Sequence, residues 1–288
     1  MKLYPIQCGN FKLDGGAMFG VVPKSLWERT NPADSKNLIE LGTRSLLVED
    51  GKKLILIDCG LGNKQDEKFF GHYSLYGDES LDKNLKKYGF VREDITDVFL
   101  THLHFDHCGG AIEWNDDKTG YRPAFKNAQF WTNENHWQWA TEPNPREKAS
   151  FLKDNILPMQ ESGQLQFLPT PKTGNYGFAP DLKMDVIFVD GHTEKQMLPV
   201  IQYQEKTIVF AADLIPTAGH IPQVYVMGYD TRPLLTMEEK GKFLKQCVEN
   251  EYLLFFEHDA HHELASLKMT EKGVKLDETF SFNEVFGY

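Results

Sequence analysis

The feature of the sequence that most constrains its fold and chemistry is a run of three histidines and one aspartate within six residues. These are His102, His104, Asp106 and His107. Ordinary core packing gives no reason to gather three imidazoles and a carboxylate so closely. Neutral imidazole and carboxylate oxygen suit Zn²⁺ and its first-row neighbours, and a site without thiolate is more often catalytic than structural. The run therefore predicts a catalytic metal site.

The spacing within this run indicates more than one ion. Alternate side chains of an extended segment share a face, so His102 and His104 are expected to bind one ion together. Asp106 and His107 follow where the chain turns, and there they can serve a second ion nearby. The motif therefore predicts a site for two metals.

The neighbouring residues predict where the motif lies in the fold. The stretch at 95–100 is apolar and partly β-branched, which is typical of a buried strand. The pair Gly109-Gly110 predicts a tight turn into a helix. We therefore expect the metal-binding loop at the carboxyl end of a strand.

One loop cannot complete two coordination shells, so further ligands are expected downstream. Three later apolar stretches, at 186–189, 207–212 and 252–256, each predict a buried strand that ends close to a ligand-type side chain. Sites built beyond the carboxyl ends of strands are common in α/β proteins. The residues at these three positions are His192, Asp213 and His258.

The pattern HxHxDH, followed by Gly191-His192-Thr193, Asp213 and His258, resembles the metallo-β-lactamase superfamily over most of the chain. This resemblance implies an αββα sandwich of two mixed β-sheets flanked by helices, whereas the order of predicted elements alone indicates only a mixed α/β fold. It also implies that Asp58 orients the ligand loop instead of binding metal. A plain turn former is the alternative for Asp58. The implied ligands are His102, His104 and His192 for one ion, Asp106, His107 and His258 for the other, and Asp213 between them.

Two further stretches, at 15–24 and 211–230, resemble a bacterial branch of the superfamily that contains quorum-quenching lactonase-like and organophosphate-hydrolase-like proteins. The chain departs from many relatives after Thr193, where it has Glu194-Lys195-Gln196 in place of Pro-Gly-His. This difference affects the shape of the loop and therefore the transfer of substrate specificity.

The resemblance also suggests residues that contact the substrate. Phe19 and Trp27 belong to a glycine-rich segment that resembles the family's active-site rim, and we expect them to line an apolar cleft. His220 either faces the metals or a substrate carbonyl, or is a histidine of a surface loop. In lactonase relatives a tyrosine near the bridging aspartate can contact the substrate oxyanion, and Tyr225 and Tyr229 are the candidates here.

The predicted secondary structure around the motif is mixed. Strands are expected at 11–13, 38–49, 53–58 and 95–100, and helices at 80–88 and 236–250. Residues 133–160 predict a broken helix interrupted by three prolines.

Length and composition favour one large domain over residues 1–288, since 41% of the residues are hydrophobic and can bury a sizeable core. The net charge of −11 argues against a nucleic-acid partner and does not favour a membrane surface. The amino-terminal residues lack the apolar core of a signal peptide, and four scattered cysteines suggest reduced thiols, so we expect a cytoplasmic protein. The sequence leaves open whether the chain forms a homodimer.

These observations predict a dinuclear metal-dependent hydrolase. Two close cations that share a water molecule lower its pKa and supply hydroxide without a serine or cysteine nucleophile. The expected substrate is a small ester or lactone, in particular a lactone of the acyl-homoserine type, with Asp106 as the proton carrier. Zinc is the default ion, and manganese, cobalt or iron would suit the same ligands.

Three alternatives remain open at this stage. The same hydroxide could attack a phosphotriester, a thioester or a β-lactam. An oxygenase-type enzyme with a single iron is a different class of activity on this fold. A relative that has kept the fold as a binding module and lost its chemistry is the third.

Overall fold

The computed structural model describes residues 1–287 and divides the chain into two compact units. The first unit contains residues 1–10 and 43–183, and the second contains residues 11–42 and those from 184 onward. Two long strands, β1 (Lys2–Asp14) and β2 (Leu38–Asp50), contribute residues to both units. The single domain predicted from the sequence stays a prediction, and each unit is described by itself below.

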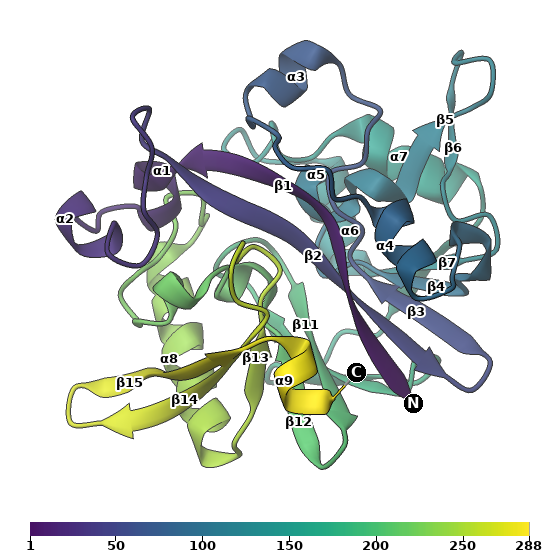
Figure 1. Cartoon of the computed structure of the whole chain (residues 1–288). Coiled ribbons are helices and arrows are strands. Elements are labelled where there is room, and N and C mark those ends of the chain that lie inside the picture. Colours follow the sequence, from purple (N-terminus) through teal and green to yellow (C-terminus); the bar gives the residue numbers. More distant parts are fainter. Residues whose placement is uncertain (288) are drawn as a thin grey trace. The chain divides into compact units, whose positions relative to one another are not determined.

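The first unit is built on a six-stranded sheet in the order β1-β2-β3-β4-β7-β8. Strands β3 (Lys53–Ile57), β4 (Asp97–Phe99), β7 (Gln129–Asn133) and β8 (Leu165–Leu168) run parallel. Strand β2 is antiparallel to β3, with which it forms a hairpin (Figure 1). The two central strands, β3 and β4, are buried at every residue except Lys53, as expected for parallel strands in the interior of a sheet. Their carboxyl ends therefore lie at one edge of the sheet, where the loop at 100–104 begins. The strand predicted at 53–58 is confirmed as Lys53–Ile57, and the one predicted at 95–100 is confirmed over three of its six residues, Asp97–Phe99.

The remaining elements of this unit are short. The predicted helix at 80–88 is confirmed as α4, and the side chain of Ser80 caps its first turn by accepting from the backbone N–H of Lys83. The broken helix predicted at 133–160 is confirmed as two separate helices, α6 and α7. The elements are α3 (Glu67–Gly71), α4 (Leu81–Lys87), η1 (Arg92–Asp94), α5 (Phe105–Cys108), η2 (Gly109–Ala111), β5 (Ile112–Trp114), β6 (Tyr121–Pro123), α6 (Glu134–Thr141), α7 (Lys153–Glu161) and β9 (Tyr176–Ala179).

One local prediction was wrong. The pair Gly109-Gly110 does not turn the chain into a helix, because the single-turn helix α5 begins earlier, inside the motif, and contains Asp106 and His107. The glycines follow it as the 3-10 turn η2.

The second unit supplies six strands of a seven-stranded sheet, in the order β15-β14-β13-β12-β11-β10. Strands β12 and β13 are parallel, and the other pairs are antiparallel. The three strands predicted upstream of His192, Asp213 and His258 are confirmed as β10, β12 and β13. The strand bounds are β10 (Met184–Val189), β11 (Gln196–Tyr203), β12 (Lys206–Phe210), β13 (Leu253–Phe255), β14 (Leu264–Thr270) and β15 (Gly273–Phe280).

The parallel pair β12 and β13 is connected through the long helix α8 (Pro233–Glu249). This confirms the helix predicted at 236–250, and it begins one turn earlier because proline is well suited to the first position of a helix. The other helices of the unit are α1 (Gly15–Phe19), α2 (Lys24–Trp27), η3 (Ala212–Leu214), η4 (Ala218–His220) and α9 (Phe282–Phe286).

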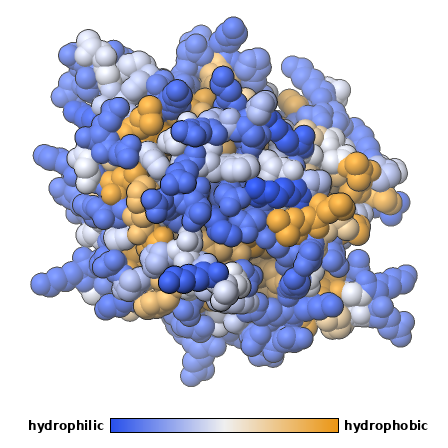
Figure 2. All heavy atoms as spheres, turned by 180° about the vertical axis from the view of Figure 1, so that it is seen from behind, coloured by the Kyte–Doolittle hydropathy of each residue, from blue (hydrophilic) through white to orange (hydrophobic). Residues whose placement is uncertain are grey.

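Each unit has an apolar interior. Leu56, Val98 and Phe130 are fully buried in the first unit, and Ile208 and Leu254 are fully buried in the second. The face of the molecule in Figure 2 is mainly hydrophilic, with small hydrophobic areas between polar side chains. Among residues 1–287, no helix has the length and apolar character needed to cross a bilayer.

Candidate metal centre

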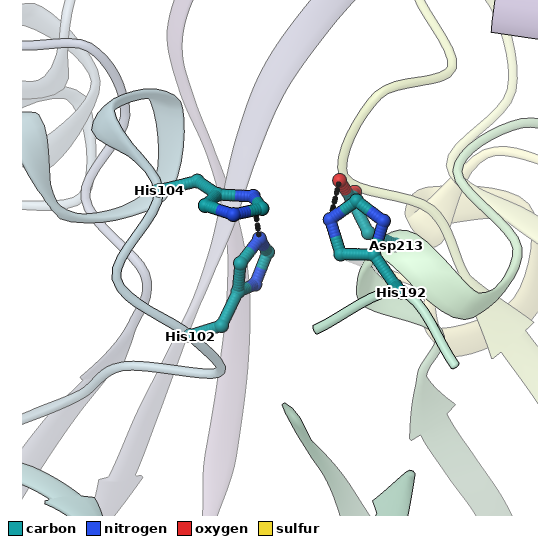
Figure 3. A group of neighbouring side chains, drawn as sticks. All are labelled: His102, His104, His192 and Asp213. Atoms are coloured by element: carbon teal, nitrogen blue, oxygen red, sulfur yellow. Dashed lines mark hydrogen bonds and ion pairs between the residues drawn. The ribbon is translucent and has the colours of Figure 1, made fainter. Parts of the chain in front are cut away.

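The loop after β4 carries the first group of ligand-type side chains. His102 and His104 are buried, and Nε2 of His102 lies 3.0 Å from Nδ1 of His104 (Figure 3). Two imidazole lone pairs at this distance repel unless a proton or a cation lies between them. The extended backbone thus brings the two rings together in the way their alternate spacing predicts.

Asp58 holds this loop from the end of β3. Its carboxylate accepts hydrogen bonds from the backbone N–H of Thr101 at 2.8 Å and from the Thr101 hydroxyl at 2.6 Å. Its Oδ2 also lies 3.0 Å from Nδ1 of His107. The opposite ring nitrogen of His107, Nε2, lies 4.0 Å from Oδ1 of Asp106. Asp58 therefore contacts the side of His107 that faces away from Asp106.

The glycines after the motif allow two backbone segments to approach closely. A Cβ atom at Gly110 would lie 2.1 Å from the carbonyl oxygen of Cys59, and one at Gly109 would lie 2.1 Å from that of Leu61. Only glycine fits at these positions without a shift of the backbone. This contact fixes the end of the ligand loop against the segment that follows Asp58.

A second segment, which includes α6 and the residues after it, packs on the other side of the loop. Nε2 of His136 accepts a hydrogen bond of 2.8 Å from the backbone N–H of Leu103, the residue between the two histidines. Glu147 lies 3.3 Å from Nε2 of His104. Sequence analysis did not anticipate either contact, because nothing in the local pattern marks them.

The second unit carries the other ligand-type side chains at three strand ends. Asp213 lies between two imidazoles, with Oδ2 3.1 Å from Nε2 of His192 and Oδ1 3.1 Å from Nε2 of His258. The pair of His192 and Asp213 is drawn in Figure 3. Nδ1 of His192 lies 2.8 Å from the carboxylate of Asp230, and Nδ1 of His258 lies 2.9 Å from the carbonyl oxygen of Gly42. The role of Asp230 was not anticipated, although it closes the stretch at 211–230.

Electrostatics at His192 favour a positive charge. Burial lowers the pKa of this imidazole, but the carboxylates of Asp213 and Asp230 raise it, and the result is a pKa of about 10. An environment that stabilises an imidazolium ion in the protein interior is also one that stabilises a bound cation.

The donor set fits divalent metal ions. In both units, each ligand-type imidazole has one nitrogen against a carboxylate, a hydroxyl or a carbonyl, and the other turned toward a second ligand-type atom. Proteins orient metal-binding histidines in this way. Nitrogen and oxygen ligands suit zinc, manganese, cobalt and iron, so these side chains do not select one ion among them.

The residues predicted to contact substrate form a stack within the second unit. The ring of Phe19 stacks on Trp27, with 5.3 Å between centroids, and on His220, with 4.1 Å. All three side chains are buried, so the alternative of a surface histidine at position 220 is wrong. Burial lowers the pKa of His220 to about 3, and its ring nitrogens contact the Thr217 hydroxyl and the Met18 carbonyl.

Tyr225 lies next to this stack and is half-buried, with its ring edge-on to Phe19 at 6.2 Å. Its backbone carbonyl accepts a hydrogen bond of 2.6 Å from the buried ammonium of Lys240 on α8. Tyr229 is 41% exposed. The assignment of substrate contacts to Phe19, Trp27, His220 and Tyr225 stays a prediction.

Comparison with known proteins defines the class. The sequence matches the family model of the metallo-beta-lactamase superfamily over residues 38–245, which is more than half of the chain. The chain has mixed sheets with flanking helices, and its ligand-type side chains offer nitrogen and oxygen atoms. Both features are typical of metal-dependent hydrolases of this superfamily. The chain belongs to the metallo-β-lactamase superfamily, as its motif predicted.

Individual relatives agree with this placement. A solved structure of a probable metal-dependent hydrolase from Staphylococcus aureus has a TM-score of 0.85 and 28% identity, and the match covers 97% of this chain and 96% of that one. An N-acyl homoserine lactonase from Bacillus cereus is 22% identical over 275 residues, which are 91% of this chain and 94% of the relative. The structure of AidC, described as a dizinc quorum-quenching lactonase in complex with its product, has a TM-score of 0.76 and 22% identity, covering 97% and 95% of the two chains.

Proposed function

We propose that this hydrolase opens lactones of the acyl-homoserine type at a centre of two divalent ions. The observation that carries the proposal is the set of oriented imidazoles and carboxylates at the strand ends of both units. The lactonases from Bacillus cereus and AidC, which this chain resembles along most of its length, support the choice of substrate.

In this proposal, each ion is held by a set of three side chains, and Asp213 is shared. Ions held by these side chains would supply a water molecule of lowered pKa and a positive charge that polarises the substrate carbonyl. One ring nitrogen of each imidazole contacts a carboxylate, hydroxyl or carbonyl. The other ring nitrogen is the one that would bind the ion. The sets are His102, His104 and His192 for one ion, and Asp106, His107 and His258 for the other.

The two ligand aspartates have different surroundings and therefore different roles. Both oxygens of Asp213 lie against imidazoles, so this carboxylate is committed to balancing positive charge. The Asp106 side chain is 13% exposed, and its Oδ1 lies 4.0 Å from Nε2 of His107, which is beyond hydrogen-bond distance. Asp106 is thus the group that takes a proton from the attacking water and returns it to the leaving alkoxide oxygen.

The proposal is tested by elemental analysis of the purified protein beside a panel of substrates. The panel contains a long-chain homoserine lactone, a β-lactam, a thioester and a phosphotriester. We expect two ions per chain and lactone opening that stops when a chelator is added. Two ions with another substrate preferred would refute the lactone assignment, and a single iron or no stoichiometric metal would refute the dinuclear hydrolase.

The proton-carrier role has its own test in Asp106→Asn. We expect a loss of about 100-fold in kcat, with metal content measured on the same sample. Asp116→Asn is the matched control, because Asp116 is an exposed aspartate in the turn between β5 and β6. A variant at Asp106 that kept both ions and full turnover would show that the role is wrong.

A further inference from the structure

A buried carboxylate lies against one of the proposed metal ligands and comes from a different part of the sequence. Glu147 follows α6 and is 3% exposed. Its Oε1 lies 3.3 Å from Nε2 of His104. An ionised carboxylate can only accept a hydrogen bond, so beside an ionised Glu147 it is Nε2 of His104 that donates and carries the proton.

The position of this proton determines which nitrogen of His104 is free for a metal. A neutral imidazole has one N–H, and its other nitrogen has a lone pair. With the proton on Nε2, the lone pair is on Nδ1, which is the atom 3.0 Å from Nε2 of His102. Glu147 therefore selects the form of His104 whose lone pair faces the neighbouring ligand.

Glu147 is itself held in place by two donors. Its second oxygen, Oε2, accepts a hydrogen bond of 2.6 Å from the indole N–H of Trp139 and another of 2.6 Å from the side-chain amide of Asn144. The backbone N–H of Glu147 donates in turn to the Asn144 side chain at 3.2 Å. These contacts leave Oε1 turned toward His104 and resist rotation of the carboxylate.

The same arrangement occurs at two other proposed ligands. Asp58 contacts Nδ1 of His107, and Asp230 contacts Nδ1 of His192. The family resemblance implied only Asp58. Glu147 supplies the equivalent contact for His104, but on Nε2, so that this ring uses Nδ1 where the other two use Nε2.

We propose that Glu147 is a positioning residue that fixes His104 with its unprotonated Nδ1 toward the metal. The inference rests on the proposed role of His104 as a ligand. Partners of this kind, when removed, lower metal affinity by about 10-fold to 100-fold.

The variant Glu147→Gln tests the inference with little change in size. The donors from Trp139 and Asn144 hold the amide oxygen of glutamine in the place of Oε2, so its NH₂ group points at His104. That NH₂ group donates to Nε2 and moves the imidazole proton to Nδ1. Glu161→Gln is the matched control, because it makes the same change at an exposed glutamate at the end of α7.

Two measurements on the full-length, zinc-loaded protein give readouts other than activity. The first is transfer of zinc to a competing chromophoric chelator, in which Glu147→Gln should lose about 10-fold to 100-fold in affinity for one ion while Glu161→Gln stays near the wild type. The second is the ¹⁵N-coupled resonance of the His104 Nε2 proton. We expect it in the wild type and in Glu161→Gln, and its loss in Glu147→Gln.

The outcomes separate this inference from the proposed function. Wild-type affinity for both ions in Glu147→Gln, together with a retained Nε2 resonance, would overturn the role of Glu147. Absence of that resonance in the wild type would overturn it even if the variant failed to fold. Absence of bound zinc in the wild type would refute the dinuclear centre on which this inference rests, whereas wild-type zinc affinity in Glu147→Gln would refute the role of Glu147 alone.

Discussion

Lys240 offers a quantitative test of the electrostatics of the second unit. Its side chain lies on α8, is 1% exposed and donates a hydrogen bond to the Tyr225 carbonyl. Among the described residues, no carboxylate forms an ion pair with it. Burial lowers the pKa of Lys240 from 10.5 to about 7, while the more distant charge of Asp230 acts in the opposite direction. The folded protein therefore binds this proton more weakly than the unfolded chain does.

The sign and the size of the effect follow from this shift. Because the pKa is lowered on folding, the charged lysine destabilises the folded state, fully so below pH 7, and the penalty disappears as the pH rises toward 10.5. A shift of this size corresponds to about 5 kcal/mol when the group is fully charged. Between pH 7.5 and 9.5 the penalty should fall by about 1.4 kcal/mol per pH unit.

Lys240→Met removes the charge and keeps most of the side-chain volume. We expect the variant to be more stable than the wild type at pH 7 by about 3 kcal/mol, since the lost hydrogen bond offsets part of the gain. Urea unfolding at a series of pH values measures the difference in free energy of unfolding. Lys242→Met is the control, because Lys242 lies on the same helix, is exposed and pairs with Glu238. A stability difference for Lys240→Met that does not change with pH would refute the reasoning.

Three further predictions concern the ligand loop and its metals. Asp58→Ala should lower the free energy of unfolding by about 4 kcal/mol in urea, because buried donors including those of Thr101 lose their acceptor; a loss below about 1 kcal/mol would contradict this account. Gly110→Ala should lower the free energy of unfolding by about 3 kcal/mol in the same assay, because its Cβ would meet the Cys59 carbonyl. Gly71→Ala, which has open space around the added atom, should leave the free energy of unfolding unchanged. Chelation should lower Tm, and zinc at a thousandfold excess over Kd should restore about 4 kcal/mol of stability; a Tm that does not respond to either treatment would count against a bound metal.

Sequence reasoning located the parts of the fold that are locally encoded. Strands β3, β4, β10, β12 and β13 are short apolar runs that end near ligand-type residues, and each was predicted at nearly its observed position. The hairpin β14 and β15 was not predicted, because neither strand has one consistently buried face and both carry charged residues that blur the alternation. The alternation of apolar and polar residues along a strand is recognisable only where one face of the strand is consistently buried.

The candidate ligands were found for the same reason, and their supporting residues were not. His102, His104 and Asp106 stand in one dense motif, so their spacing alone indicates a metal. Glu147 and Asp230 are ordinary acidic residues in their local sequence, and their partners lie far away along the chain. Such contacts are decided by tertiary packing, which a single sequence does not display.

The unequal distribution of ligands along the chain has a consequence for the order in which metal is acquired. The motif at 102–107 lies within one loop and one helical turn. Binding an ion there closes only a very short loop of chain, so it costs little conformational entropy. Asp213, His192 and His258 become neighbours only after β10 to β13 have paired, because tens of residues separate them in sequence. During synthesis from the amino terminus, the motif leaves the ribosome well before the last of these strands. A nascent chain is thus able to hold a cation at the histidines of the motif before Asp213, His192 and His258 come together, and the availability of the ion during synthesis becomes part of how the enzyme matures.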